Sequence, residues 1–198
     1  MGRTVGIGIQ DFEDIIKNNC FYIDKTSFIK EWWENGDSVT LITRPRRFGK
    51  TLNMSMLNRF FSLDFAGKGE IFEGLSIWEE EKYRNLQGTY PVINLSFASI
   101  KETDFKTTQL RMIELLQTLF ERFSFLHQSD KLSENEQNYV KSMTREMTAF
   151  EASSALHRLS ELLYKHYGKK VIILLDEYDT PMQEAYVNGF WDDLVAFT

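Results

Sequence analysis

Residues 38–51 read S-V-T-L-I-T-R-P-R-R-F-G-K-T and join an apolar run to a basic stretch that contains a glycine. The β-branched side chains of residues 38–43 predict a buried strand. Apolar residues at helical spacing over residues 50–63 predict a helix. Loops that bind phosphate occur between a strand and a helix, so residues 44–51 are the first candidate site.

The residue types of this loop suit a phosphate. A helix N-terminus offers free N–H groups and the positive end of a dipole. Gly49 lets the backbone approach an anion, Lys50 can reach β- and γ-phosphates, and the Thr51 hydroxyl can bind Mg²⁺. The pattern departs from G-x-x-x-x-G-K-[ST] at its first position, where Arg44 stands. We expect the phosphates to contact Arg44, Pro45, Arg46, Arg47, Phe48, Gly49, Lys50, Thr51 and Leu52.

An acidic pair ends a second apolar run. Residues 169–175 predict a buried strand, and Asp176 and Glu177 follow it directly. Ligands of open α/β sheets bind at the carboxyl ends of strands. Asp176 can therefore hold Mg²⁺, and Glu177 can polarise the water that attacks a γ-phosphate. Together the two stretches read as Walker A and Walker B motifs. The competing interpretation is a chance G-K-T at a helix start and a solvated strand end.

The remaining pattern predicts an α/β fold in one compact unit. Strands that alternate with helices, and runs that are apolar on both faces, are typical of a parallel sheet flanked by helices. We interpret residues 1–37 as a lead-in and residues 38–198 as a nucleotide-binding core with a helical insertion at about 101–166. Two capping-box signatures predict helix starts at Ser133 and Thr148. Further predicted elements are a strand at 90–97 and helices at 10–17, 26–34, 105–123, 134–146 and 149–166.

Composition excludes several classes of protein. The 198 residues carry a formal net charge of −6, which argues against a protein that wraps nucleic acid. The single cysteine, Cys20, excludes an intrachain disulfide, and the three histidines lack zinc-ligand spacing. An aromatic content of 14% predicts a bulky core. Residues 1–17 have no apolar signal-peptide region, and no run approaches the ~20 residues of a membrane span, which favours a soluble, cytoplasmic protein.

Several blocks together resemble the AAA-ATPase-like domain of bacterial proteins. The resemblance implies an ATP-binding P-loop fold of the catalytic-glutamate class with Mg²⁺ as cofactor, and Arg44 is then a habit of the family. It also implies that such chains usually continue, often into a restriction-endonuclease-like nuclease domain, and that a further strand should lie beyond Thr198, so the chain looks truncated. The blocks are residues 21–26 (F-Y-I-D-K-T), 43–51, 71–75 (I-F-E-G-L), 91–93 (P-V-I) and 174–179 (L-L-D-E-Y-D).

Two assignments stay open at this point. In related ATPases the lead-in segment lies near the adenine, so Tyr22 or Lys25 is a candidate for that pocket. Packing of Tyr22 on the core is an equal alternative. For Asp179, a turn that ends the strand is preferred to assistance of Mg²⁺ or of an arginine.

The sequence supports three functions in decreasing order. The first is an Mg²⁺-dependent ATPase, with Lys50 and Glu177 as its catalytic residues and Thr51 and Asp176 at the metal, that acts as a switch for an effector domain beyond Thr198 or for a second copy of the chain. The second is a nucleotide-sensing module that binds ATP without hydrolysing it. The third is an accessory nucleic-acid-binding domain that uses Arg44, Arg46 and Arg47. Small-molecule kinase activity is possible, but no acceptor motif is legible.

Overall fold

The structure, a computed structural model, describes residues 4–43 and 48–198. It divides into two compact units, an N-terminal unit, Met1–Val92, and a C-terminal unit, Ile93–Thr198. In the described ranges, no helix combines the length and the apolar character that crossing a bilayer requires.

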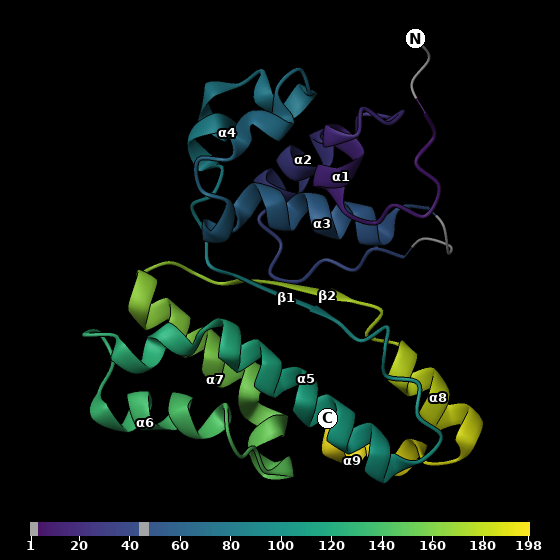
Figure 1. Cartoon of the computed structure of the whole chain (residues 1–198), viewed down its shortest axis with the longest axis vertical. Coiled ribbons are helices and arrows are strands. Elements are labelled where there is room, and N and C mark those ends of the chain that lie inside the picture. The colour runs from purple at the N-terminus through teal and green to yellow at the C-terminus, as the bar shows by residue number, and fades with distance from the viewer. Residues whose placement is uncertain (1–3, 44–47) are drawn as a thin grey trace. The chain divides into compact units, whose positions relative to one another are not determined.

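The N-terminal unit is helical and built on aromatic side chains. The ring of Phe72 stacks on Phe12, with centroids 5.2 Å apart, and meets the edge of Phe60 at 5.3 Å. The expected bulky core is therefore confirmed here. Helix α1 lies beside α3 (Figure 1), and Arg59 of α3 binds Asp11 at 2.8 Å. The helices are α1 (Phe12–Lys17), α2 (Ser27–Asn35), α3 (Lys50–Phe61) and α4 (Glu81–Leu86), with 3-10 turns at Leu63–Phe65, Gly69–Phe72 and Ser76–Trp78.

Residues 38–43 do not form the strand that their side chains predict. They belong to no strand and to no isolated bridge. Val39 is 88% exposed and Leu41 is 62% exposed. β-Propensity describes how well a side chain fits a pleated, half-buried surface, and it supplies no neighbouring strand. The predicted strand was wrong for this reason, whereas the helix that follows the loop begins at Lys50 as predicted.

The C-terminal unit holds a small parallel sheet flanked by helices. Strands β1 (Val92–Ser96) and β2 (Ile172–Asp176) pair with each other, and β1 starts at the boundary between the units. Side chains of β1 such as Ile93 and Leu95 share one apolar cluster with Leu119 of α5 and Leu163 of α7. Figure 1 shows α5 and α7 below the strands. The helices are α5 (Phe105–Arg122), α6 (Glu134–Met143), α7 (Ala149–Tyr167), α8 (Thr180–Asn188) and α9 (Trp191–Phe197).

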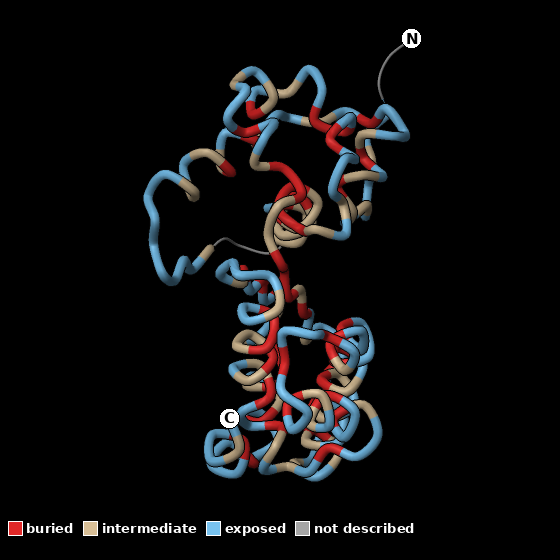
Figure 2. Tube along the Cα trace, turned by 90° about the vertical axis from the view of Figure 1, so that its left-hand side faces the viewer, coloured by how far each residue is buried: buried red, intermediate tan, exposed pale blue. Residues whose placement is uncertain are grey.

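Both predicted capping boxes form. The Ser133 hydroxyl accepts from the Glu136 amide at the start of α6, and the Glu136 carboxylate accepts from the Ser133 amide at 3.0 Å. Thr148 and Glu151 make the same pair of bonds at the start of α7. These helices, together with α5, place the buried residues of the unit between helices and strands, as the burial colours of Figure 2 show.

Candidate functional site

The start of helix α3 depends on the backbone of Gly49. This residue is the N-cap of α3 and has φ 77° and ψ 23°, a left-handed conformation that side chains disfavour. A Cβ added there would meet no atom within 4 Å. The glycine is therefore required by conformation, and the space in front of the helix is open.

The first turn of α3 has donors without acceptors. No side chain caps this helix, and the first backbone bond runs from the Asn53 amide to the Gly49 carbonyl at 2.9 Å. In the described ranges, no acceptor is bonded to the amides of Lys50, Thr51 and Leu52, and no carboxylate pairs with the Lys50 amine. Helix α5, in contrast, is capped by Asp104, whose carboxylate accepts from the Thr107 amide at 2.9 Å. Free amides, a dipole end and an unpaired ammonium together fit an anion.

The rest of the predicted loop is described only in part. Phe48 is 59% exposed. Thr51 and Leu52 are half-buried on the first turn of α3. Arg44, Pro45, Arg46 and Arg47 lie outside the described residues.

The segment before the loop is fixed to α3 by Tyr22. The Tyr22 hydroxyl lies 3.6 Å from Met56 Sδ and accepts from the Lys25 amide at 3.2 Å. Its ring meets the edge of Phe12 at 5.5 Å. Burial raises the pKa of this phenol above its ordinary value, against the opposing Lys25 amide. These contacts favour the packing role of Tyr22 over a place in an adenine pocket.

Asp24 and Thr26 of the same segment bind the turn Ser76–Trp78. Asp24 accepts from the Ser76 amide at 2.8 Å and from the Thr26 amide at 2.8 Å. The Thr26 hydroxyl accepts from the Ile77 amide at 3.1 Å. Partial burial opposes ionisation of Asp24, but the Ser76 and Thr26 amides outweigh it and lower its pKa. The D-x-T of this block therefore has a structural task.

The carboxyl end of β2 carries the acidic pair. The Phe97 amide donates to the Asp176 carbonyl at 3.0 Å, so the pairing of the two strands extends to Asp176. The Asp176 side chain is buried, and its carboxylate has no hydrogen-bond partner among residues 4–43 and 48–198. A buried carboxylate without a partner is costly. Its oxygen atoms, like the Thr51 hydroxyl, are donors that Mg²⁺ prefers, so the residue types fit this ion.

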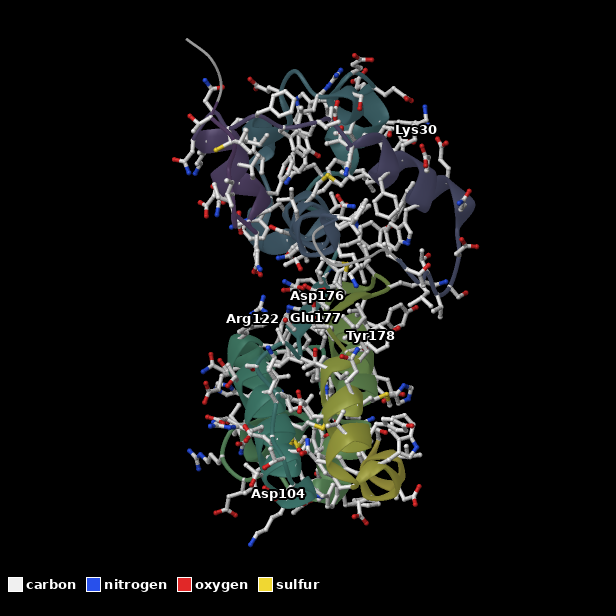
Figure 3. All side chains as sticks on the ribbon, turned by 90° about the vertical axis from the view of Figure 1, so that its right-hand side faces the viewer. Lys30, Asp104, Arg122, Asp176, Glu177 and Tyr178 are labelled. Carbon is white, nitrogen blue, oxygen red and sulfur yellow. The ribbon has the colours of Figure 1, made fainter. Side chains whose placement is uncertain are left out.

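Glu177 has an unusual backbone. Its φ of 53° is positive, which in the described chain occurs at one further non-glycine residue, Asn19. The Thr180 amide donates to the Glu177 carbonyl at 3.0 Å, and the Thr180 hydroxyl lies 3.3 Å from Glu177 Oε2. Figure 3 shows Asp176, Glu177 and Tyr178 together where β2 leads into α8. The sequence analysis missed Thr180, although a hydroxyl three residues after the glutamate was the available signal.

Asp179 lies at the start of α8, as the turn interpretation predicts. It is the N-cap residue of that helix, and its carboxylate accepts from the Gln183 amide group at 2.7 Å.

The two candidate motifs lie in different units. Phe48, Gly49, Lys50, Thr51 and Leu52 belong to Met1–Val92, whereas Asp176 and Glu177 belong to Ile93–Thr198. Within each described part, no cluster of three or more histidine, cysteine, aspartate or glutamate side chains forms a metal site by itself. The convergence of the two motifs on one ligand remains a prediction.

Comparison with known proteins gives a consistent result. A family model named AAA-ATPase-like, described as a predicted AAA-ATPase, matches residues 6–196. An uncharacterised protein of the vnfD 5′ region in Azotobacter chroococcum mcd 1 is 30% identical over 185 residues. The match covers 91% of this chain and 30% of that relative, so the chain spans about a third of the relative's length. No solved structure matches the chain.

Proposed function

Because the chain belongs to the AAA-ATPase-like family, which implies ATP binding, we propose that it binds ATP with Mg²⁺ and hydrolyses it. The observation that carries the proposal is the start of α3, where an unpaired Lys50 amine stands beside three amides without acceptors. Such a helix start binds phosphate through hydrogen bonds and through its dipole.

Each residue of this helix start has a defined task. The amides of Lys50, Thr51 and Leu52 donate to phosphate oxygens, and Gly49 keeps the approach clear of side-chain atoms. The Lys50 ammonium neutralises charge on the β- and γ-phosphates. Residues 44–48 extend the loop around the phosphates, and Arg44, Arg46 and Arg47 raise the local positive potential.

Thr51 and Asp176 would hold the metal ion. The Thr51 hydroxyl is a neutral oxygen donor, and the Asp176 carboxylate is a charged one that is buried and unpartnered in the described chain. When bound, Mg²⁺ offsets the charge that builds up on the phosphates during transfer. This arrangement requires Lys50 and Asp176 to meet at a single nucleotide, and we propose that they do so.

Glu177 would act as the general base. Thr180 occupies Oε2, whereas Oε1 of Glu177 makes no hydrogen bond within the described residues. A carboxylate with one free oxygen can accept a proton from water as that water attacks the γ-phosphate. The proton then rests on Glu177 until products leave.

The biological output is proposed to be a switch. ATP binding and hydrolysis would control an effector, such as a nuclease-like domain encoded with this one, or a second copy of the chain that supplies an arginine to the transferring phosphate. The greater length of the Azotobacter relative leaves room for an effector in that protein.

Two substitutions test the proposal. Lys50→Ala should lose affinity for Mg²⁺–ATP, whereas Glu177→Gln should keep affinity and lose turnover. Lys106→Ala is a matched control because Lys106 lies in the first turn of α5, a helix start that Asp104 already caps. Calorimetric titration measures affinity, and phosphate release measures turnover. Unchanged affinity in Lys50→Ala would contradict the binding site. A wild-type chain that binds ATP without turnover would instead be a nucleotide-sensing module.

A further inference from the structure

Thr180 holds Glu177 by two separate contacts. Its amide donates to the Glu177 carbonyl at 3.0 Å and closes the turn that leads from β2 into α8. Its hydroxyl donates to Oε2 of the Glu177 carboxylate at 3.3 Å. The second contact is independent of the turn, because the backbone bond closes the turn without any side chain.

The surroundings of Thr180 fix the direction of that hydroxyl. Thr180 is buried, with an exposed fraction of 9%, and Pro181 follows it. A β-branched side chain in a packed position has few rotamers, so the hydroxyl cannot turn freely to another acceptor. Glu177 in turn starts from a left-handed backbone, which directs its side chain in a way that an extended strand residue would not. Strained backbone of this kind is typical of functional positions.

We propose that Thr180 is a positioning residue that holds one carboxylate oxygen of Glu177 so that the other faces the attacking water. This inference rests on the proposed ATPase function. A glutamate side chain has three rotatable bonds, and a fixed Oε2 restricts the positions of Oε1. Restricting a reacting group to its productive geometry lowers the activation barrier without changing how tightly the substrate binds.

A purely structural role for the hydroxyl predicts something different. If it only stabilised the first turn of α8, its removal would lower stability and leave the turnover of the folded protein unchanged. Thr108 provides the matched case, because it is 1% exposed in the first turns of α5 and its hydroxyl donates to the Asp104 carbonyl at 2.8 Å.

The test compares Thr180→Val, Thr180→Ser and Thr108→Val in the full 198-residue chain. Thr180→Val keeps shape and removes the donor, and we expect kcat to fall about tenfold, with KM and the Kd of Mg²⁺–ATP unchanged. Thr180→Ser keeps the donor and should retain most of the wild-type kcat. Thr108→Val should lose stability but keep kcat. Thr180→Ala replaces the valine variant if that variant does not fold.

The outcomes separate the two proposals. If Glu177→Gln abolishes turnover while Thr180→Val turns over like the wild type, the positioning role is overturned and the ATPase assignment stands. A fall of kcat in Thr180→Ser equal to that in Thr180→Val would also overturn it, because the hydroxyl would then be irrelevant. A wild-type chain that binds Mg²⁺–ATP without any turnover would overturn both proposals.

Discussion

The amide of Phe97 donates a 3.0 Å hydrogen bond to the carbonyl of Asp176, and this bond marks the end of strand pairing in the C-terminal unit. The next residue, Glu177, leaves the strand with φ 53°. The acidic pair is thus divided by its backbone into a buried strand residue, Asp176, and a half-exposed turn residue. Two adjacent carboxylates in such different settings can have different tasks.

The left-handed backbone of Glu177 should cost stability. Glu177→Gly is expected to raise the free energy of unfolding by up to about 1 kcal/mol, because glycine adopts positive φ without a Cβ penalty. Turnover should be lost at the same time. Asn19→Gly is the matched control, since Asn19 also has positive φ and asparagine tolerates it better. Urea denaturation measures both variants, and a Glu177→Gly chain less stable than the wild type would contradict the strain.

Gly49→Ala should affect both folding and binding. Alanine at φ 77° costs about 1 kcal/mol of stability. It should also weaken Mg²⁺–ATP binding, because the methyl group points into the space in front of α3. Gly36→Ala is the matched control, since Gly36 ends α2 at φ 66° and its added Cβ also meets nothing within 4 Å. Equal loss of ATP affinity in both variants would show that the effect is merely one of stability.

Tyr22→Phe distinguishes packing from an adenine pocket. Loss of the hydroxyl leaves the Lys25 amide without its acceptor, at a cost of about 1 kcal/mol in stability. ATP affinity should not change, because the ring still packs on Phe12. Calorimetric titration of the folded variant decides, and a clear loss of ATP affinity would restore Tyr22 to the pocket.

Glu136 should make stability depend on pH. The Lys165 ammonium, followed by the Ser133 amide, lowers its pKa from 4.5 to about 2. A lowered pKa in the folded state stabilises the protein above the unfolded pKa, near 4.5, and this contribution is lost as the pH falls toward 2. Glu136→Gln should therefore cost about 1–2 kcal/mol at pH 7 and nearly nothing at pH 2.

Glu151→Gln is the control for this pH effect. Glu151 makes the same capping box at α7, where Thr148 alone lowers its pKa. Its substitution should change stability less at pH 7. Chemical denaturation at several pH values measures both variants, and an equal pH dependence of the two would exclude a special role for Lys165.

Local signals allowed most helix bounds to be predicted from the sequence. The capping boxes at Ser133 and Thr148 and the glycine at position 36 act within one turn of chain, so their effect is legible without the fold. Residues 38–43 failed because a strand requires a neighbour that composition does not specify. The Thr180–Glu177 contact was missed because it depends on the positive φ of Glu177 and on a side-chain rotamer, and neither can be read from residue types.

The motif analysis identified the residue types of the candidate site but not its assembly. The glycine, lysine and threonine at residues 49–51 begin a helix with free amides, as expected. Asp176 and Glu177 end a strand, as expected. Whether the two motifs meet depends on how two compact units combine around a ligand, and that interaction leaves no periodic pattern in the sequence.

One measurement tests the central claim most directly. Manganese replaces magnesium in the complex of the 198-residue chain with a non-hydrolysable ATP analogue, and amide NMR signals near the paramagnetic ion are broadened. We predict selective broadening of residues 49–52 and of residues 176–178 in one and the same complex, and its loss from both segments in Lys50→Ala. Broadening confined to one segment, with the other unaffected at saturating ligand, would contradict the proposal that Lys50 and Asp176 serve a single nucleotide.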